Sequence, residues 1–166
     1  MIIRAADAKD AADIASIWNP QIRDTVNTFT TVEKTRAEMA HDISARQAGG
    51  DAFLVAVERV EVIGFATYFS FRQGPGYTHT KEHSIWLAPH ASGHGTGRAL
   101  MAELENHAID AGVHSLIAAI SAENTGAVAF HEKIGFRPVA VIPQAGRKFD
   151  RWIDLALMQK LLTNAA

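Results

Sequence analysis

The chain has 166 residues, of which 48% are hydrophobic, and a formal net charge of −2 at pH 7. This length predicts one domain over residues 1–166, which buries about two-thirds of the surface of its unfolded chain. The near-neutral charge argues against nucleic-acid and membrane-surface partners, and the absence of cysteine excludes disulfides and a cysteine nucleophile.

The chain opens with a short apolar strand and an amphipathic helix. Residues 2–4 read as the strand, and Asp7 is placed to cap the helix. Apolar residues at positions i, i+3 and i+4 define the buried face of this helix: Ile14, Ile17 and Trp18. Because proline disfavours helical geometry in the residue before it, we expect the helix to end or bend at Asn19-Pro20.

A polar segment, residues 28–31, separates this helix from the next, and its aromatic residue, Phe29, is expected to be exposed. Thr35 and Glu38 form a capping box that opens the second helix, and Gly49-Gly50 ends it. Two buried strands joined by a short charged connection are then expected, over residues 52–57 and 62–71.

The middle of the chain carries a strand, a glycine-dense turn and a helix in direct succession. The strand covers residues 78–87, and the turn holds Gly93, Gly95 and Gly97 at alternate positions. Glycine leaves the backbone N–H groups open to a ligand, and the helix points its positive dipole end into the same turn. This combination predicts a site for a pyrophosphate, with Arg98 as a cationic contact.

The last third of the chain contains three strands and one helix. The strands are expected over residues 116–120, 136–142 and 150–158, and the helix over residues 124–134. Strands joined by both hairpins and helices predict a mixed α/β domain.

The eight histidines match no common metal-ligand spacing, and we expect no metal. Residues 1–7 lack the apolar core of a signal peptide, and no apolar run reaches the length of a membrane span. We therefore expect a cytoplasmic protein with no membrane partner.

Several blocks of sequence together resemble the phosphinothricin and methionine-sulfone acetyltransferase branch of the GNAT N-acetyltransferases. These blocks are 64–68, Phe71-Arg72, 76–80, 82–84, 95–98, Asn124, His131-Glu132, Gly135-Phe136 and 146–154. The resemblance implies the GNAT fold, a single mixed and bent sheet of about seven strands with flanking helices. Its fourth and fifth strands would splay apart to hold acetyl-CoA, and many such proteins are homodimers, which we predict here.

The resemblance also implies a set of coenzyme contacts from the strand, the glycine turn and one asparagine. They are Ile85, Trp86, Leu87, Gly93, His94, Gly95, Thr96, Gly97, Arg98 and Asn124. Asn124 equally suits a helix N-cap, and the two roles are compatible. Two positions depart from the family pattern, because Ser92 replaces the usual Gln or Arg and Phe130 lies where many relatives have a tyrosine acid.

The reaction implied is attack of a neutral amine on a thioester, and an α-amine is only about one-tenth neutral at pH 7. Glu82 is the candidate base, directly or through a water, and otherwise a solvated strand-end carboxylate. His131 is the candidate acid for the thiolate, and otherwise a half-buried helix histidine. His83 points to the opposite strand face from Glu82 and is interpreted as structural.

The acceptor amine is expected to carry a carboxylate. Arg72 is the candidate to bind it, since the guanidinium fork suits a carboxylate, and is otherwise a surface arginine. Phe29 and Tyr77, with Gly76 beside it, are expected to line the acceptor pocket next to Glu82. A late basic cluster is interpreted as a solvated charge run: Arg147, Lys148 and Arg151.

Together the residues and the resemblance imply an acetyl-CoA-dependent N-acetyltransferase. Its acceptor would be the α-amine of a small amino acid or analogue, such as phosphinothricin, methionine sulfoximine or methionine sulfone, attacking directly in a ternary complex. One alternative acceptor is a protein or peptide N-terminus or a polyamine, although a polyamine would need acidic residues where Arg72 and Lys148 lie. The other alternative is a non-catalytic acyl-CoA-binding sensor, which Phe130 and Ser92 would suit.

Overall fold

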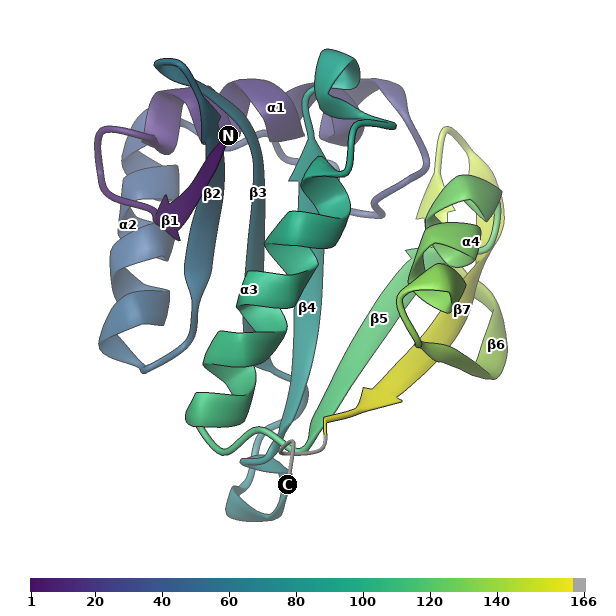
Figure 1. The fold of residues 1–166 in the computed structure, drawn as a ribbon. Coiled ribbons are helices and arrows are strands. Elements are labelled where there is room, and N and C mark those ends of the chain that lie inside the picture. Colours follow the sequence, from purple (N-terminus) through teal and green to yellow (C-terminus); the bar gives the residue numbers. More distant parts are fainter. Residues whose placement is uncertain (163–166) are drawn as a thin grey trace.

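A computed structural model describes residues 1–162, so the predicted domain end at residue 166 lies outside the described residues. The strands (Figure 1) are β1 (Ile2–Ala5), β2 (Phe53–Glu58), β3 (Glu61–Ser70), β4 (Thr80–Leu87), β5 (Ser115–Ser121), β6 (Arg137–Lys148) and β7 (Arg151–Leu161). The helices are α1 (Ala11–Asp24), α2 (Arg36–Ala48), α3 (Thr96–Asp110) and α4 (Thr125–Lys133), with 3-10 turns η1 (Pro75–Tyr77) and η2 (Pro89–Ala91). None of the helices within residues 1–162 is long and apolar enough to span a bilayer.

The strands form one sheet in the order β1-β2-β3-β4-β5-β7-β6. Neighbouring strands are antiparallel except β4 and β5, which run parallel. Their pairing is confined to residues 80–82 of β4 and 115–117 of β5, and beyond Glu82 the two strands diverge (Figure 1). The predicted mixed sheet of about seven strands with splayed fourth and fifth strands is therefore confirmed.

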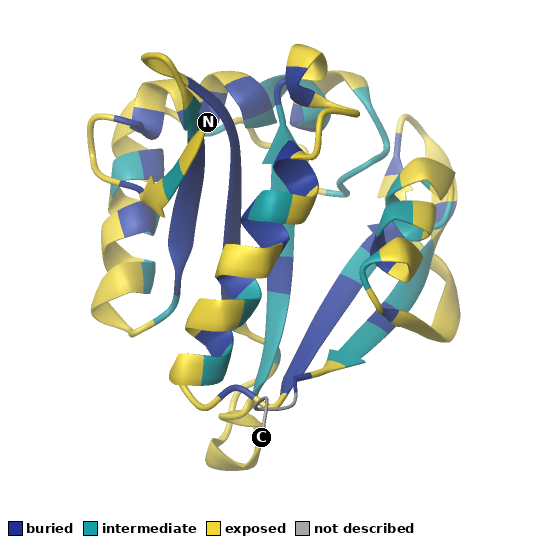
Figure 2. Ribbon diagram, in the orientation of Figure 1, coloured by how far each residue is buried: buried dark blue, intermediate teal, exposed yellow. Residues whose placement is uncertain are grey.

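Helices cover both faces of the sheet, with α3 and α4 in front of it and α1 and α2 behind it in Figure 1. Residues of β4 alternate between these faces: Trp86 stacks on Trp18 of α1 with 6.5 Å between ring centroids, whereas Leu87 packs beside Gly97 of α3. The centre of the sheet is the most buried part, and residues 62–68 of β3 are all buried (Figure 2). The alternation of β4 places two different environments on either side of a single strand.

The first helix differs from its prediction at both ends. Its N-cap residue is Asp10 rather than Asp7, and the Asp10 carboxylate binds the Arg4 guanidinium at 2.7 and 2.8 Å instead of capping the helix. The helix also continues through Pro20 to Asp24. The Asn19 side-chain amide exchanges two hydrogen bonds of 2.9 Å with the Lys34 backbone, so this part of α1 is tied to the chain that leads into α2.

The predicted capping box of α2 is present. The Thr35 hydroxyl accepts from the Glu38 amide at 3.2 Å, and the Glu38 carboxylate accepts from the Thr35 amide at 2.8 Å. Gly49 is the C-cap, as expected. The helix is therefore fixed at both ends by its local sequence.

The C-terminal hairpin is longer than predicted, since β6 continues to Lys148 rather than ending at Ile142. The pairing of β6 with β7 shifts register between Ile142 and Gly146, where Gln144 has a φ of 52°. Almost every residue of β6 is exposed, so residues 143–148 show no alternation of apolar and polar side chains. Backbone hydrogen bonds to β7 extend the strand through these residues, and the side-chain pattern in the sequence could not predict this extension.

Two side chains expected to be solvated are packed together at the end of β6. Lys148 is only 5% exposed, and its ammonium donates a hydrogen bond of 2.9 Å to the Thr28 carbonyl. Phe29 is half-buried, and its ring lies where a Cβ on Gly146 would be. These contacts join segments more than a hundred residues apart, which is why the local sequence did not predict them, and they fix the loop around Phe29 over the sheet.

Candidate active site

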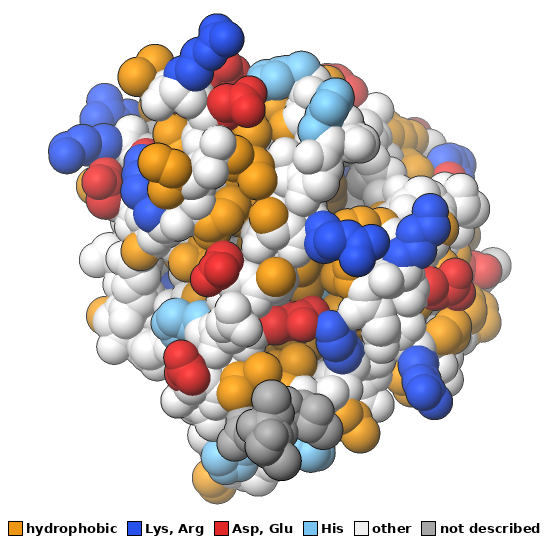
Figure 3. Space-filling view, in the orientation of Figure 1, with side chains coloured by type: hydrophobic (Ala, Val, Ile, Leu, Met, Phe, Trp, Pro, Cys, Tyr) orange, Lys and Arg blue, Asp and Glu red, His pale blue; other side chains and the backbone are white. Residues whose placement is uncertain are grey.

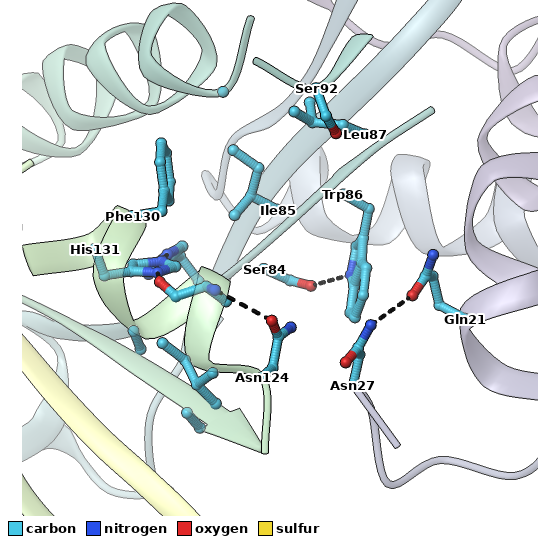
Figure 4. Close-up of a pocket in the computed structure, with 16 residues that line it drawn as sticks. Gln21, Asn27, Ser84, Ile85, Trp86, Leu87, Ser92, Asn124, Phe130 and His131 are labelled. Carbon is cyan, nitrogen blue, oxygen red and sulfur yellow. Dashed lines mark hydrogen bonds between the residues drawn. The ribbon is translucent and has the colours of Figure 1, made fainter. Parts of the chain in front are cut away.

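The divergence of β4 and β5 opens a groove on the α3 and α4 side of the sheet. A cavity of about 300 Å³ lies there, bounded by residues 83–87 of β4, 118–120 of β5 and the start of α4 (Figure 4). Beyond Glu82, the edge of β4 that faces β5 has no strand partner within the described chain. Its N–H and C=O groups are therefore available to an extended ligand.

Several of the predicted coenzyme residues line this groove: Ile85, Trp86, Leu87, Gly97 and Asn124. Asn124 is also the N-cap of α4, where its Oδ1 accepts a hydrogen bond of 3.1 Å from the Ala127 amide. Figure 4 shows the Asn124 side chain beside the groove, so its N-cap position and its place at the cavity coincide.

Of the other predicted residues, Gly93, His94 and Gly95 form the turn that leads into α3, and Thr96 and Arg98 lie in its first turn. Gly93 and Gly95 have φ values of 82° and 85°, in the left-handed region that glycine adopts without strain. The first hydrogen bond of α3 runs from the Ala99 amide to the Gly95 carbonyl at 3.0 Å. The amides of residues 96–98 therefore precede the helical ladder and have no partner within it.

Gly97 serves a different purpose from the two glycines before it. It lies inside α3, and a Cβ at this position would be 3.3 Å from the Phe130 ring. The missing side chain lets α3 approach α4 across the groove. Lys and Arg side chains gather beside the gap between these two helices (Figure 3), which makes this opening attractive to phosphate groups.

A second cavity, of about 380 Å³, lies on the opposite face of the sheet. Glu82, Ser84 and Trp86 contribute to it from β4, and the loop of residues 27–30 and helix α2 contribute from outside the sheet. The two cavities have five lining residues in common: Asn27, His83, Ser84, Trp86 and Ala119. They therefore meet at the point where β4 and β5 separate.

Glu82 lies at this meeting point, in the second cavity. Burial raises the pKa of its carboxyl group above the ordinary value, and the positive charge of Arg72 acts in the opposite direction. Phe29 lines the same cavity, but Arg72, Gly76 and Tyr77 do not. These three are exposed residues at the end of β3 and in η1, close enough for the Arg72 charge to act on the carboxylate.

Two buried polar atoms have no hydrogen-bond partner among the described residues: Trp18 Nε1 and Ser121 Oγ. Both residues line the second cavity. A buried polar group without a partner costs about 1–3 kcal/mol. Both atoms are enclosed by protein, so they are unsatisfied positions in the cavity wall rather than groups that face a ligand.

His83 and His131 form a buried pair next to the first cavity. Their Nε2 atoms are 2.9 Å apart. His83 Nδ1 lies 3.1 Å from the Ile117 carbonyl oxygen, and His131 Nδ1 lies 2.7 Å from the Ala127 carbonyl oxygen. Carbonyl oxygens only accept hydrogen bonds, so both Nδ1 atoms carry protons. The contact between the two Nε2 atoms is then a hydrogen bond only when one of them carries a further proton. Burial lowers the pKa of both imidazoles, to about 3 for His83, so a proton held there is readily released.

Comparison with known proteins identifies the family. A profile described as an Acetyltransferase (GNAT) domain matches residues 3–157. The chain belongs to the GNAT acetyltransferases.

Individual relatives of this GNAT acetyltransferase cover nearly its whole length. L-amino acid N-acyltransferase MnaT of Escherichia coli is 35% identical over 96% of this chain and 92% of its own. The L-methionine sulfoximine/L-methionine sulfone acetyltransferase of Salmonella typhimurium is 35% identical over 100% of this chain and 97% of its own. The crystal structure of a phosphinothricin acetyltransferase from Sinorhizobium meliloti in complex with AcCoA superposes with a TM-score of 0.92, at 33% identity over 97% of this chain and 88% of that one.

Several residues at the site of this GNAT acetyltransferase were not predicted. Ser84, whose hydroxyl accepts from Trp86 Nε1 at 2.8 Å, lies two residues after Glu82 and so could have been placed on the same strand face. Asn27, which donates to the Gln21 side chain at 3.0 Å, and Arg46 of α2 line the cavities without any local signal. They reach the site only through the packing of α1, α2 and the intervening loop on the sheet.

Proposed function

We propose that this GNAT acetyltransferase transfers an acetyl group from acetyl-CoA to the α-amine of a small amino acid or analogue. The observation that carries the proposal is the junction of two cavities on opposite faces of β4, beside the carboxylate of Glu82. One cavity is open to an extended ligand and lies beside the glycine turn, whereas the other, of similar size, is lined by Glu82 and by residues of α2. Such an arrangement suits two substrates that react in a ternary complex.

The first groove would hold acetyl-CoA, which supplies the acetyl group as a thioester when bound. Backbone groups of Ile85 and Leu87 on the open edge of β4 would pair with its extended arm, and Asn124 lies at the opposite wall. The amides of residues 93–98, together with Arg98, would bind its phosphates. The solved relative in complex with AcCoA supports this assignment.

Glu82 is proposed as the general base. Its carboxylate lines the acceptor cavity at the junction, and burial raises its pKa toward the range in which a carboxylate accepts a proton efficiently. An α-amine, with a reference pKa near 8, demands only a modest base at neutral pH. The role of Glu82 is to take the ammonium proton, directly or through a water, so that the neutral amine can attack.

His131 is proposed as the acid that protonates the departing thiolate. It lines the first groove, one residue after Phe130, which has no proton to give. Burial lowers the pKa of His131, so its imidazole is mainly uncharged at neutral pH and would relay a proton to the thiolate rather than store one. The pair would take the place of the tyrosine acid that Phe130 replaces in the family pattern.

The acceptor would be a small amino acid rather than a large or polycationic amine. A cavity of about 380 Å³ suits a small molecule, and Arg72, which does not line it but is close enough for its charge to act on Glu82, would bind the acceptor carboxylate. The Asp42 carboxylate in the lining is paired with Lys34, whereas no carboxylate lies within 4.0 Å of Arg46 in the described chain, and this free positive charge disfavours a polyamine. The names of the relatives support amino-acid analogues, with phosphinothricin, methionine sulfoximine and methionine sulfone as candidates.

Thiol release measured with acetyl-CoA and these three compounds tests the proposal. Saturable release with at least one of them is the expected result. If none is acetylated, the acceptor assignment is wrong. If calorimetry also detects no binding of acetyl-CoA to the folded protein, the coenzyme groove is wrong as well.

A further inference from the structure

We propose that Arg46 binds an anionic group at the end of the acceptor's side chain and so selects acidic acceptors. This inference rests on the proposed function, because it assigns one wall of the same acceptor cavity. Arg46 is therefore a specificity residue, distinct from the base and from the group that binds the α-carboxylate.

The Arg46 guanidinium is held in place on the cavity wall. Its Nη1 donates to the Thr67 hydroxyl at 3.0 Å, and that hydroxyl in turn donates to the Ala52 carbonyl at 2.7 Å. The guanidinium carbon lies 4.7 Å from the centroid of the Phe69 ring and 5.8 Å from that of Phe53. A guanidinium fixed by a buried threonine and two rings loses little freedom when it binds a ligand.

The charge of Arg46 is not neutralised by any carboxylate within 4.0 Å in the described part of the chain. Asp42, one helical turn earlier, pairs with Lys34 at 2.9 Å, and Asp51 pairs with Lys81 at 2.7 Å. A guanidinium has five N–H donors, and the Thr67 contact uses one. Burial lowers the pKa of Arg46, and the more distant charges of Asp42 and Asp51 offset this only in part, so the charged form would gain from an anion at its side.

Arg46 shares a cavity with the proposed base. It contacts Thr67 and Phe69 of β3, and Phe69 is the register partner of Glu82 on β4. Arg46 and Glu82 line the same cavity, Arg46 from over β2 and β3 and Glu82 from β4, with Phe69 in register beside Glu82. An amino acid with its ammonium at Glu82 would direct a short side chain toward Arg46, while Arg72 remains available for the α-carboxylate.

This placement favours a tetrahedral or planar acid at the γ position, such as a phosphinate or a carboxylate. Phosphinothricin and methionine sulfone provide a matched pair, because each ends in a methyl group and two oxygens on a tetrahedral centre. They differ in charge, since the phosphinate is an anion and the sulfone is neutral. A guanidinium binds the anion through charge-assisted hydrogen bonds that the sulfone cannot match.

The test compares kcat/KM for these two acceptors in the unaltered protein, in Arg46→Gln and in Arg36→Gln. Arg36 is an exposed arginine at the start of the same helix and serves as the matched control. We expect Arg46→Gln to lower kcat/KM for phosphinothricin about 10- to 100-fold and that for methionine sulfone less than threefold. Arg36→Gln should change neither, and Arg72→Gln should lower both by a similar factor.

An equal loss for both acceptors in Arg46→Gln, or no loss for either, overturns the proposal. Calorimetric binding of phosphinothricin and methionine sulfone separates this inference from the proposed reaction. Suppose that the unaltered protein acetylates neither compound, yet binds phosphinothricin at least tenfold more tightly than Arg46→Gln does. The proposed reaction is then wrong, but the anion site at Arg46 is supported. If phosphinothricin binds the two proteins equally, the anion site is wrong whatever reaction the protein catalyses.

Discussion

Replacement of Glu82 by glutamine tests the centre of the proposed mechanism. The amide has nearly the shape of the carboxylate but cannot accept a proton from an ammonium. Because Glu82 lines the acceptor cavity and is part of no ion pair within 4.0 Å in the described chain, its removal should leave the fold intact. The change therefore isolates the proton transfer.

The expected loss follows from the chemistry of the acceptor. A positioned acid or base contributes about 10²- to 10⁴-fold, so kcat for Glu82→Gln at pH 7 should fall by at least 100-fold. An α-amine with a pKa near 8 is about one-tenth neutral at pH 7 and about nine-tenths neutral at pH 9. Without a base, the variant depends on amine that is already neutral, so its rate should rise about tenfold between these two pH values.

Thiol release measured from pH 6 to pH 9.5 at saturating acetyl-CoA gives both quantities, and calorimetry gives the coenzyme affinity. The unaltered protein should vary much less with pH over this range. Glu103→Gln, an exposed position on α3, is the control. A variant that retains the kcat of the unaltered protein at pH 7, or a loss explained wholly by weaker coenzyme binding, refutes the assignment of Glu82 as base.

Four further outcomes are expected. Burial raises the pKa of the Glu82 carboxyl in the folded state, so the contribution of Glu82 to stability is greatest below the unfolded pKa of 4.5 and declines as the pH rises through the folded pKa. Thermal denaturation should therefore show that Glu82→Gln is more stable than the unaltered protein at pH 7 and equally stable near pH 4. Gly146→Ala should displace the Phe29 ring and raise KM for the acceptor severalfold, while calorimetry shows unchanged coenzyme affinity. Thr35→Ala removes a capping box and should lower the free energy of unfolding by about 1 kcal/mol, or about 2–4 °C in Tm. Sedimentation should detect a homodimer, and Trp152→Glu, on the exposed β6–β7 face, should weaken it; a monomer at every concentration contradicts this prediction.

The elements that the sequence predicts well are those fixed by short-range rules. The capping box at Thr35 and Glu38 is one example, because its two partners are three residues apart. The glycine turn is another, since Gly93 and Gly95 have the left-handed φ values for which glycine is required. The alternation of β4 likewise places Glu82 and His83 on opposite faces from their positions alone.

The predictions that proved wrong concern contacts between distant segments. Of the two outcomes expected at Pro20, an end or a bend, the end is wrong, since α1 continues to Asp24, and Asn19 is bound there to the distant backbone of Lys34. Lys148 was taken for a solvated charge, but the Thr28 carbonyl accepts from its ammonium in a buried position. A residue's own neighbours in the sequence contain no signal for such contacts, whatever its intrinsic preference.

The same distinction explains why the two halves of the site differ in how far they could be predicted. The groove proposed for the coenzyme takes one wall from a continuous stretch, residues 83–97, whose strand and glycine turn follow from local sequence, while β5, α4, Gln21 and Asn27 supply the rest. The cavity proposed for the acceptor is lined by α1, α2, the loop of residues 27–30 and five strands, β2, β3, β4, β5 and β7, which meet only in the folded chain. Arg46 illustrates this, because it reaches the cavity from α2 by packing over β3. It follows that substitutions on α2 and at residues 28–30 can change the proposed acceptor site while the groove proposed for the coenzyme, which these residues do not line, stays unchanged.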